Sequence, residues 1–557
     1  MTEQEHPRPA RRFTIPRATS HELGTLPDLD LHGTGSVAPP VAPRIDDAIQ
    51  SERPVEWAPS PATDEPTATP APAPASAPAS PRPAASTPRA GGSLTPWRYE
   101  ADAWRMNRRL TRRQANLMLR MRTARAIPQS LHARFAAMGL PDDVVDETLG
   151  SIRSLDAWPD AWIETAQRYL GDFRRQVSAG NQVDGARNQA LAGLCYHIAQ
   201  IVTDEHDRRT ATMCRTAAAS LYSHALPYVH PTVTRITIPW RAKSLPGYLH
   251  LPLDSATDHA YGLIVLLNGA SSSKEETLAW AGPFIRAGFA VLAMDSPGTG
   301  EAARTPFSTD QDDILDGVFA TLAHDPRLDL SQVVVVGISL GGNQALRCAA
   351  YDRRIAGVVA VTAPVQPDRW IGRISPLLRS ELLAMTPSGD ASLPALVEHL
   401  DLRPIVEKIA CPVLVVGAGH DMVVPPTESQ HLAQLLGPLA TLDWFSESSH
   451  CVYDQIGTWV GDAARWATAV FELQAEFAAA ARGANRADVS QAIAAGAREA
   501  LLAAPPVEPV IEEQDDLTEG ARLLDPDEIL DDDPDWYRAA PEPQSHETNQ
   551  RRPRPRR

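Results

Sequence analysis

The chain has 557 residues and carries 52 Lys and Arg against 69 Asp and Glu, a formal net charge of −17. This length leaves room for two domains with tails, and the negative charge argues against nucleic-acid binding over the whole surface. Five scattered cysteines, mostly within apolar runs, predict reduced thiols and a cytoplasmic location. The chain has no apolar run of about 20 residues, so we expect no membrane span, and its N-terminus does not resemble a signal peptide.

The N-terminal segment, residues 1–93, is rich in Pro and Ala and is densest in both at Thr67–Pro78. Such a composition cannot bury enough apolar surface to offset chain entropy, so we expect a disordered tail. A basic stretch follows between Trp97 and Arg125. Its Trp104, Leu110, Leu117 and Met121 fall roughly on one helical stripe, which favours a helix packed by that face. Contact with an anionic membrane surface or nucleic acid is the alternative.

The most informative stretch is Val333–Asn343, in which four valines meet the pattern Gly-Ile-Ser339-Leu-Gly and a helix-compatible run follows. Strand, sharp turn and helix are the context of a nucleophile elbow. The turn holds Ser339 in a strained conformation, and small neighbours let the strand and helix crowd together. The free N–H groups of the helix start then point at the same place.

A serine nucleophile needs a histidine base and a carboxylate that fixes the imidazole tautomer. Downstream, Cys411–Gly417 reads as a buried parallel strand, with Asp421 just after its end. A last short strand then leads into a loop that carries His450. Catalytic groups of open α/β sheets gather at the carboxyl ends of strands, so Ser339, Asp421 and His450 are predicted to form a triad.

The oxyanion that forms on attack needs two backbone donors. The N–H of Leu340, directly after the nucleophile, is the first candidate. The second is the N–H of Ala270, with Gly269 in reserve, because Gly262–Leu267 reads as a strand that leads into Asn268-Gly-Ala-Ser-Ser-Ser.

The next predicted strand runs into the turn Asp295-Ser-Pro-Gly-Thr-Gly-Glu301. Proline and glycine meet backbone requirements in tight turns, so a scaffold role is favoured for this motif. Substrate contact by Glu301 is the alternative.

The segment from about Leu140 to Ala478 resembles the α/β-hydrolase superfamily. It looks like the branch that holds FrsA-like esterases, fungal pigment-pathway polyketide-shortening hydrolases and a bacterial dihydroxypseudooxynicotine C–C hydrolase. The motifs Asn268–Glu276, Asp295–Glu301 and Gly337–Gly342 carry this resemblance, with the helical segment from Trp158 to Ala225 ahead of them. The resemblance implies a mostly parallel sheet flanked by helices and maps the family triad onto Ser339, Asp421 and His450.

Four parts are therefore expected along the chain. Residues 1–93 form the Pro/Ala-rich tail, and residues 94–230 an N-terminal helical or cap domain. Residues 231–478 form the α/β-hydrolase catalytic domain, with a cap insertion at about 365–409. Residues 479–557 are helical at first and then become an acidic, disordered tail.

The predicted function is a serine hydrolase that acts through an acyl-enzyme on a small, partly apolar carbonyl substrate. An ester or acyl bond and a C–C bond next to a carbonyl both remain open. The alternatives are a peptidase of short substrates and a non-catalytic hydrolase-fold protein that binds or assembles through its tails. No Cys/His cluster has zinc spacing, and we expect neither a metal nor another cofactor. Protein partners of the tails and a homo-oligomer are left open.

Overall fold

A computed structural model describes residues 112–121, 129–201, 208–253, 260–374, 379, 382–387, 392–480 and 485–503. The predicted tail at 1–93, the part of the predicted tail 479–557 beyond residue 503, and the basic residues before 112 lie outside this described part. The described residues belong to one compact unit that extends over Gly91–Arg557. Among them, no helix combines the length and the apolar character needed to cross a membrane.

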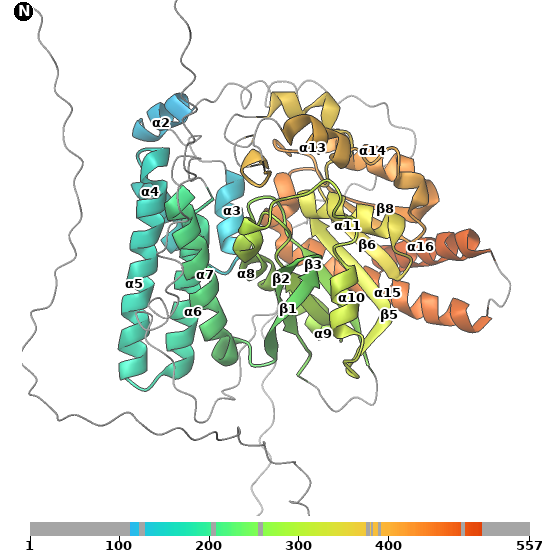
Figure 1. The fold of residues 1–557 in the computed structure, drawn as a ribbon, viewed down its shortest axis with the longest axis horizontal. Coiled ribbons are helices and arrows are strands. Elements are labelled where there is room, and N and C mark those ends of the chain that lie inside the picture. Colours follow the sequence, from blue (N-terminus) through green and yellow to red (C-terminus); the bar gives the residue numbers. More distant parts are fainter. Residues whose placement is uncertain are drawn as a thin grey trace, which may run out of the picture. The chain divides into compact units, whose positions relative to one another are not determined.

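The centre of this unit is an eight-stranded sheet with the strand order β1-β2-β4-β3-β5-β6-β7-β8 (Figure 1). Strands β4, β3, β5, β6, β7 and β8 run parallel, whereas β2 pairs antiparallel with both β1 and β4. The predicted mostly parallel sheet flanked by helices is therefore confirmed. The strand bounds are β1 Val233–Trp240, β2 Lys243–His250, β3 Tyr261–Leu267, β4 Ala290–Met294, β5 Leu328–Ile338, β6 Ile355–Val361, β7 Val413–Ala418 and β8 Ala440–Phe445.

The central strands are apolar on both faces, as strands covered by helices on both sides must be. Side chains alternate across a strand, so Val333 and Val335 of β5 pack into one core while Val334 and Val336 pack into the other. The first core lies under α10, α11 and α14, and the second under α8, α9, α15 and the N-terminal helices. The bounds are α8 Lys274–Leu278, α9 Gly282–Arg286, α10 Asp316–Leu322, α11 Leu340–Tyr351, α14 Pro426–Leu436 and α15 Ile456–Ala480.

The helices ahead of the sheet share the second core, and Figure 1 shows α5, α6 and α7 side by side. A Cβ added to Gly193 of α6 would meet the Ala218 carbonyl oxygen of α7 at 3.0 Å, so these two helices approach closely. The domain boundary predicted at residue 230 stays a prediction. The helix bounds are α2 Arg112–Arg120, α3 Gln129–Ala137, α4 Asp142–Ser151, α5 Trp158–Ser178, α6 Gln182–Ala199 and α7 Arg208–Val229, with the 3-10 turn η1 at Leu155–Ala157.

The apolar stripe predicted for the basic stretch is wrong in its described part. On α2 and just after it, Leu117 is 57% and Met121 66% exposed, whereas Ala115 and Leu119 are buried. The small residue Ala115 faces the neighbouring helices, so the buried face of α2 is rotated away from the larger apolar side chains.

The region between β6 and β7, where the cap insertion was predicted, contains in its described residues short turns and the helix α13. Its Leu383, Met385 and Leu396 form an apolar cluster with Phe307 and with Leu340 at the start of α11. This segment is thus packed onto the edge of the sheet where β5 ends. The bounds are η4 Pro367–Arg369, η5 Ile371–Arg373, α13 Leu393–Leu400 and η7 Val406–Lys408.

The described part ends with α16 (Arg486–Ala503), which lies within the segment predicted as a C-terminal tail. This helix packs against the hydrolase region, because Ile493, Ala494 and Ala497 are buried and the Ser490 hydroxyl donates to the Ala410 carbonyl at 2.6 Å. The remaining turns are η3 Gly300–Arg304, η8 Gly437–Leu439 and η9 His450–Gln455.

Candidate active site

Ser339 occupies the sharp turn between β5 and α11, with φ 54° and ψ −115°. A Cβ on Gly337 would lie 2.1 Å from the Gly341 carbonyl oxygen, and a Cβ on Gly341 would lie 2.3 Å from the Leu267 carbonyl oxygen. Both positions therefore require glycine, because backbone atoms occupy the space of a side chain. The crowding predicted for a nucleophile elbow is present, and Ser339 is half-buried at its tip.

The structure brings Ser339, His450 and Asp421 together. His450 Nε2 lies 2.9 Å from Ser339 Oγ, and His450 Nδ1 lies 2.7 Å from Asp421 Oδ2. The other carboxylate oxygen, Asp421 Oδ1, accepts the backbone N–H groups of Val423 at 2.8 Å and Val424 at 2.9 Å. Two backbone donors thus fix the carboxylate, which in turn fixes the ring. The imidazole is 15% exposed and the carboxylate 1% exposed.

The charge of Asp421 sets the proton affinity of the imidazole. Burial lowers the pKa of His450, but the adjacent Asp421 carboxylate and Cys451 together raise it, so the pKa is about 10, above its ordinary value of 6.5. The carboxylate therefore strengthens the imidazole as a proton acceptor from Ser339.

The loop that carries His450 is held in an unusual conformation. Cys451 and Val452 have φ values of 65° and 53°, and Thr362, just after β6, has φ 44°. Such conformations cost of order 1–3 kcal/mol each in residues other than glycine. The Cys451 N–H donates to Thr362 Oγ1 at 3.2 Å, and the Thr362 N–H donates to the Val416 carbonyl at 2.9 Å. The ends of β6 and β7 thus hold the backbone next to His450.

The two predicted oxyanion donors lie near the elbow. A Cβ on Gly269 would meet Ser339 Cβ at 3.6 Å, which places the loop after β3 beside the serine. Leu340 is the first residue of α11, and Ala270 follows Gly269. Within the described ranges, neither N–H is paired with an acceptor.

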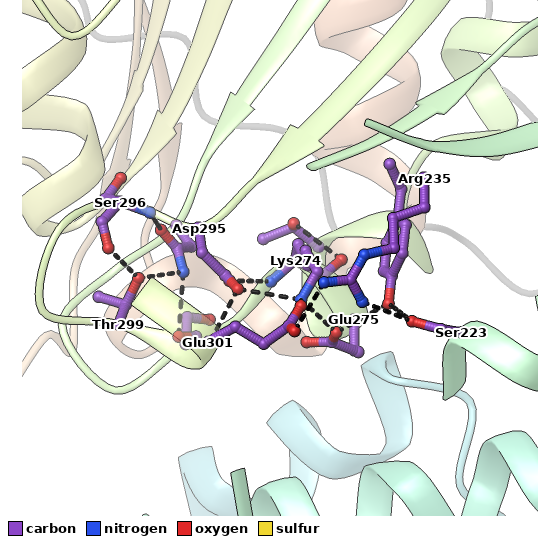
Figure 2. Close-up of polar contacts among 12 residues, drawn as sticks. Ser223, Arg235, Lys274, Glu275, Asp295, Ser296, Thr299 and Glu301 are labelled. Atoms are coloured by element: carbon purple, nitrogen blue, oxygen red, sulfur yellow. Dashed lines mark hydrogen bonds and ion pairs between the residues drawn. The ribbon is translucent and has the colours of Figure 1, made fainter. Parts of the chain in front are cut away.

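Glu301 belongs to a buried charge cluster that Figure 2 shows. The ammonium of Lys274, which is fully buried, lies 2.6 Å from Glu275, 3.0 Å from Asp295 and 2.5 Å from Glu301. Arg235 donates to the other Glu301 oxygen at 2.9 Å. Because both oxygens of Glu301 face cations of the protein, the geometry favours its scaffold interpretation over substrate contact.

This cluster joins the two loops that the sequence motifs mark. Asp295 accepts the backbone N–H of Lys274 at 2.8 Å and that of Glu301 at 3.0 Å. Asn268 donates to the Ser272 carbonyl at 3.0 Å and to Thr299 Oγ1 at 2.9 Å. The loop after β4 therefore braces the loop after β3 that carries Ala270.

A second buried cluster, centred on Glu276 of α8, was not predicted from the sequence. This carboxylate contacts Arg134, His197 and Tyr453, which come from α3, α6 and η9. Burial raises the pKa of Glu276, but Arg134 and His197 lower it by more, to about 2. No local motif marks Arg134 or His197, and only the charged run Lys274-Glu275-Glu276 next to a buried strand hinted at Glu276.

Apolar side chains pack next to Ser339 and next to Asp421 in two clusters. Leu340 and Ala270 belong to the apolar cluster with Leu383, Met385 and Leu396. Val423 and Val424, just after Asp421, pack with Trp370 and Ile371. In the part of the chain that the structure describes, no group of three or more His, Cys, Asp or Glu could hold a metal ion.

Comparison with known proteins agrees with this architecture. Residues 264–463 match the model of the alpha/beta hydrolase family. The 2,6-dihydropseudooxynicotine hydrolase of Paenarthrobacter nicotinovorans is 25% identical over 269 residues, which cover 48% of this chain and 71% of that protein. The hydrolyase poxO of Penicillium oxalicum is 31% identical over 226 residues, which cover 37% of this chain and 52% of that protein. This chain thus spans only about half the length of that fungal relative.

A crystal structure of the 2,6-dihydroxy-pseudo-oxynicotine hydrolase superposes with a TM-score of 0.54 at 22% identity, over 61% of this chain and 95% of that one. At this identity the superposition concerns the fold alone. The family match and the hydrolases among the relatives support an enzyme of the hydrolase type. The resemblance seen in the sequence motifs is confirmed, because residues 264–463 match the α/β-hydrolase family model and the superposition shows the same fold.

Proposed function

We propose that the protein is a serine hydrolase in which Ser339 is the nucleophile, His450 the general base and acid, and Asp421 the residue that orients His450. The observation that carries the proposal is the continuous pair of contacts, 2.9 Å from Ser339 to His450 and 2.7 Å from His450 to Asp421. The strained elbow supports it, because strain at a non-glycine residue is typical of functional sites.

In the proposed reaction, Ser339 Oγ attacks the carbonyl carbon of the substrate while its proton passes to His450 Nε2. The N–H groups of Leu340 and Ala270 donate to the oxyanion. When the tetrahedral intermediate collapses, the bond to the leaving group breaks and His450 returns the proton to that group. Water, deprotonated by His450, then releases the acid from the acyl-enzyme.

The substrate that fits best is small and partly apolar. Support comes from the apolar clusters that include Leu340, Ala270 and the residues after Asp421. An ester or acyl bond and a C–C bond next to a carbonyl both suit this chemistry, because each yields an acyl-serine and a leaving group that takes up one proton. The name of the bacterial relative, a pseudooxynicotine hydrolase, favours a small molecule over a polymer.

The test uses labelling by a fluorophosphonate together with turnover of p-nitrophenyl acetate and butyrate. In Ser339→Ala, labelling disappears and turnover falls by at least roughly 10⁴-fold, and His450→Ala shows a comparable loss of turnover. Ser331→Ala is the matched control, because Ser331 is an exposed serine on the same strand.

Full turnover in Ser339→Ala would contradict the proposal. Wild-type protein that is labelled but leaves both esters intact would favour the C–C bond as the target. A folded wild-type protein that is not labelled would favour the binding or assembly role.

A further inference from the structure

Glu276 is a fully buried carboxylate at the point where three parts of the fold meet. It accepts a two-pronged contact from Arg134 of α3, with Nε at 2.8 Å and Nη2 at 2.7 Å. His197 of α6 lies 3.1 Å away, and the Ser272 hydroxyl of the loop after β3 donates at 2.5 Å. The carboxylate is thus saturated by groups from the N-terminal helices and from the hydrolase region.

The same arginine also contacts the loop that carries Ala270. Arg134 Nη1 donates to Ser271 Oγ at 3.1 Å, and Nη2 donates to the Ser271 carbonyl at 3.0 Å. Ser271 follows Ala270 directly. Two consecutive residues of the loop, Ser271 and Ser272, are therefore held by the Arg134–Glu276 pair.

The pair also reaches the segment that carries His450. The hydroxyl of Tyr453, three residues after His450, donates to Glu276 Oε1 at 3.2 Å. The guanidinium of Arg134 lies over the Tyr453 ring, 5.9 Å from its centroid. One ion pair thus contacts both loops that flank Ser339, on the oxyanion side and on the base side.

Stability alone is a poor explanation for this pair. The Arg134 side chain is 9% and that of Glu276 0% exposed, so both lose their hydration on folding. Apolar residues of similar volume often stabilise such a place equally well or better. What only arginine provides is a planar fork that binds a carboxylate and a neighbouring carbonyl at once.

We propose that Arg134 is a positioning residue for catalysis, which acts through Glu276, Ser271 and Tyr453 to hold the Ala270 loop and the His450 loop in register with Ser339. In this role the N-terminal helical region helps to set the geometry of the active site. The inference rests on the proposed function, because it requires the Ala270 N–H to donate to the oxyanion and His450 to act as general base and acid.

The test separates the rate at each working site from the number of such sites. Active-site titration with a fluorophosphonate counts the reactive serines, and the acylation rate is then expressed per titrated site. Arg134→Ala lowers this rate about 10- to 100-fold with little change in KM, as a misplacement of about 1 Å does. Arg134→Lys keeps the charge but loses the fork, so it does not restore the rate.

Two further variants complete the test. Tyr453→Phe removes only the hydroxyl and lowers the rate per site by about 5-fold, the size of effect of one ordinary hydrogen bond. Arg187→Ala is the matched control, because Arg187 forms an exposed ion pair with Asp184 in the same helical region. Its rate and titre stay at the wild-type values.

A merely structural role gives a different result: fewer titratable sites in Arg134→Ala, each as fast as wild type. That result overturns the inference. If Arg134→Ala and Arg134→Lys fail to fold, a wild-type rate per site in Tyr453→Phe overturns it. Retained labelling in Ser339→Ala would instead overturn the proposed function itself, so the two failures are distinguishable.

Discussion

The triad residues Ser339, Asp421 and His450 and the cluster around Glu276 both join residues far apart in the chain. They differ in the elements of secondary structure that carry these residues. Ser339, Asp421 and His450 all follow strand ends, and Ser339 and His450 are only partly buried. The Glu276 cluster is buried, and most partners of Glu276 come from helices and a turn, with Ser272 from the loop after β3. Parallel strands bring their carboxyl ends to one edge of the sheet, so topology alone assembles the first cluster. The second depends on how helices pack, which no local pattern encodes.

A large effect is expected for Asp421→Asn, which changes the acid of the triad. The amide cannot stabilise a charged imidazole, so kcat falls by about 10⁴-fold. Wild-type turnover rises with pH as His450 loses its proton, with a midpoint above 6.5 because Asp421 raises this pKa. In Asp421→Asn the midpoint moves to lower pH.

The measurement is a pH–rate profile of ester turnover for both proteins. Asp184→Asn is the control, because its carboxylate is exposed on α6. A wild-type profile in Asp421→Asn would mean that the acid of the site lies elsewhere.

The next effect concerns the buried cluster around Lys274. Lys274→Met leaves Glu275, Asp295 and Glu301 without the cation they share, and we expect a loss of about 3–5 kcal/mol in the free energy of unfolding. Lys274→Arg is not a conservative change, because a planar guanidinium replaces a compact ammonium that has no exposed surface.

Urea unfolding measures both Lys274 variants. Lys243→Arg, at an exposed lysine, stays within about 0.5 kcal/mol of wild type. If Lys274→Arg matched this control, the cluster would tolerate either cation, and the compact ammonium would not be required.

A smaller effect appears in acid. The pKa of Glu276 is lowered from 4.5 to about 2, so its contribution to stability is complete above pH 4.5 and is lost as the pH falls through about 2. At about 1.4 kcal/mol per pKa unit, this contribution is about 3 kcal/mol. The stability difference between wild type and Glu276→Gln should therefore shrink as the pH falls from 4.5 to 2.

Urea unfolding at several pH values follows this difference, with Glu147→Gln as the exposed control. A difference that stays constant over this pH range would show that Glu276 gains nothing from being ionised in the folded protein.

The positions of Ser339, Asp421 and His450 could be predicted from the sequence because they depend on local properties and on strand order. The valine run and the glycines around Ser339 report a buried strand and a crowded turn, both local properties. Asp421 and His450 follow from strand order, and the structure places all three in contact. Their catalytic roles stay predictions.

The buried clusters could not be predicted in this way. Arg134 is one of many arginines in the chain, and its partner Glu276 lies 142 residues away. Lys274 offered a faint signal, since Lys243 and Lys408 are the only other lysines. The face of α2 was also misjudged, because the larger apolar residues Leu117 and Met121 are exposed. Pairings between helices depend on their rotation and approach, which the composition of a single helix does not determine.

The smallest expected effects come from two glycines and test how far local crowding explains the elbow. A Cβ on Gly341 would lie 2.3 Å from the Leu267 carbonyl oxygen and 2.6 Å from that of Asn268. Gly341→Ala must therefore push the loop after β3 away from α11, at a cost of about 1–3 kcal/mol. Gly150, on α4, has nothing within 4 Å of such a Cβ, so Gly150→Ala should stabilise the protein by about 0.5–1 kcal/mol. Thermal unfolding of the two variants shows which of them is the more stable. Equal stability would mean that the elbow can relax, and the close approach of strand and helix would then not be what holds Ser339 in its strained conformation.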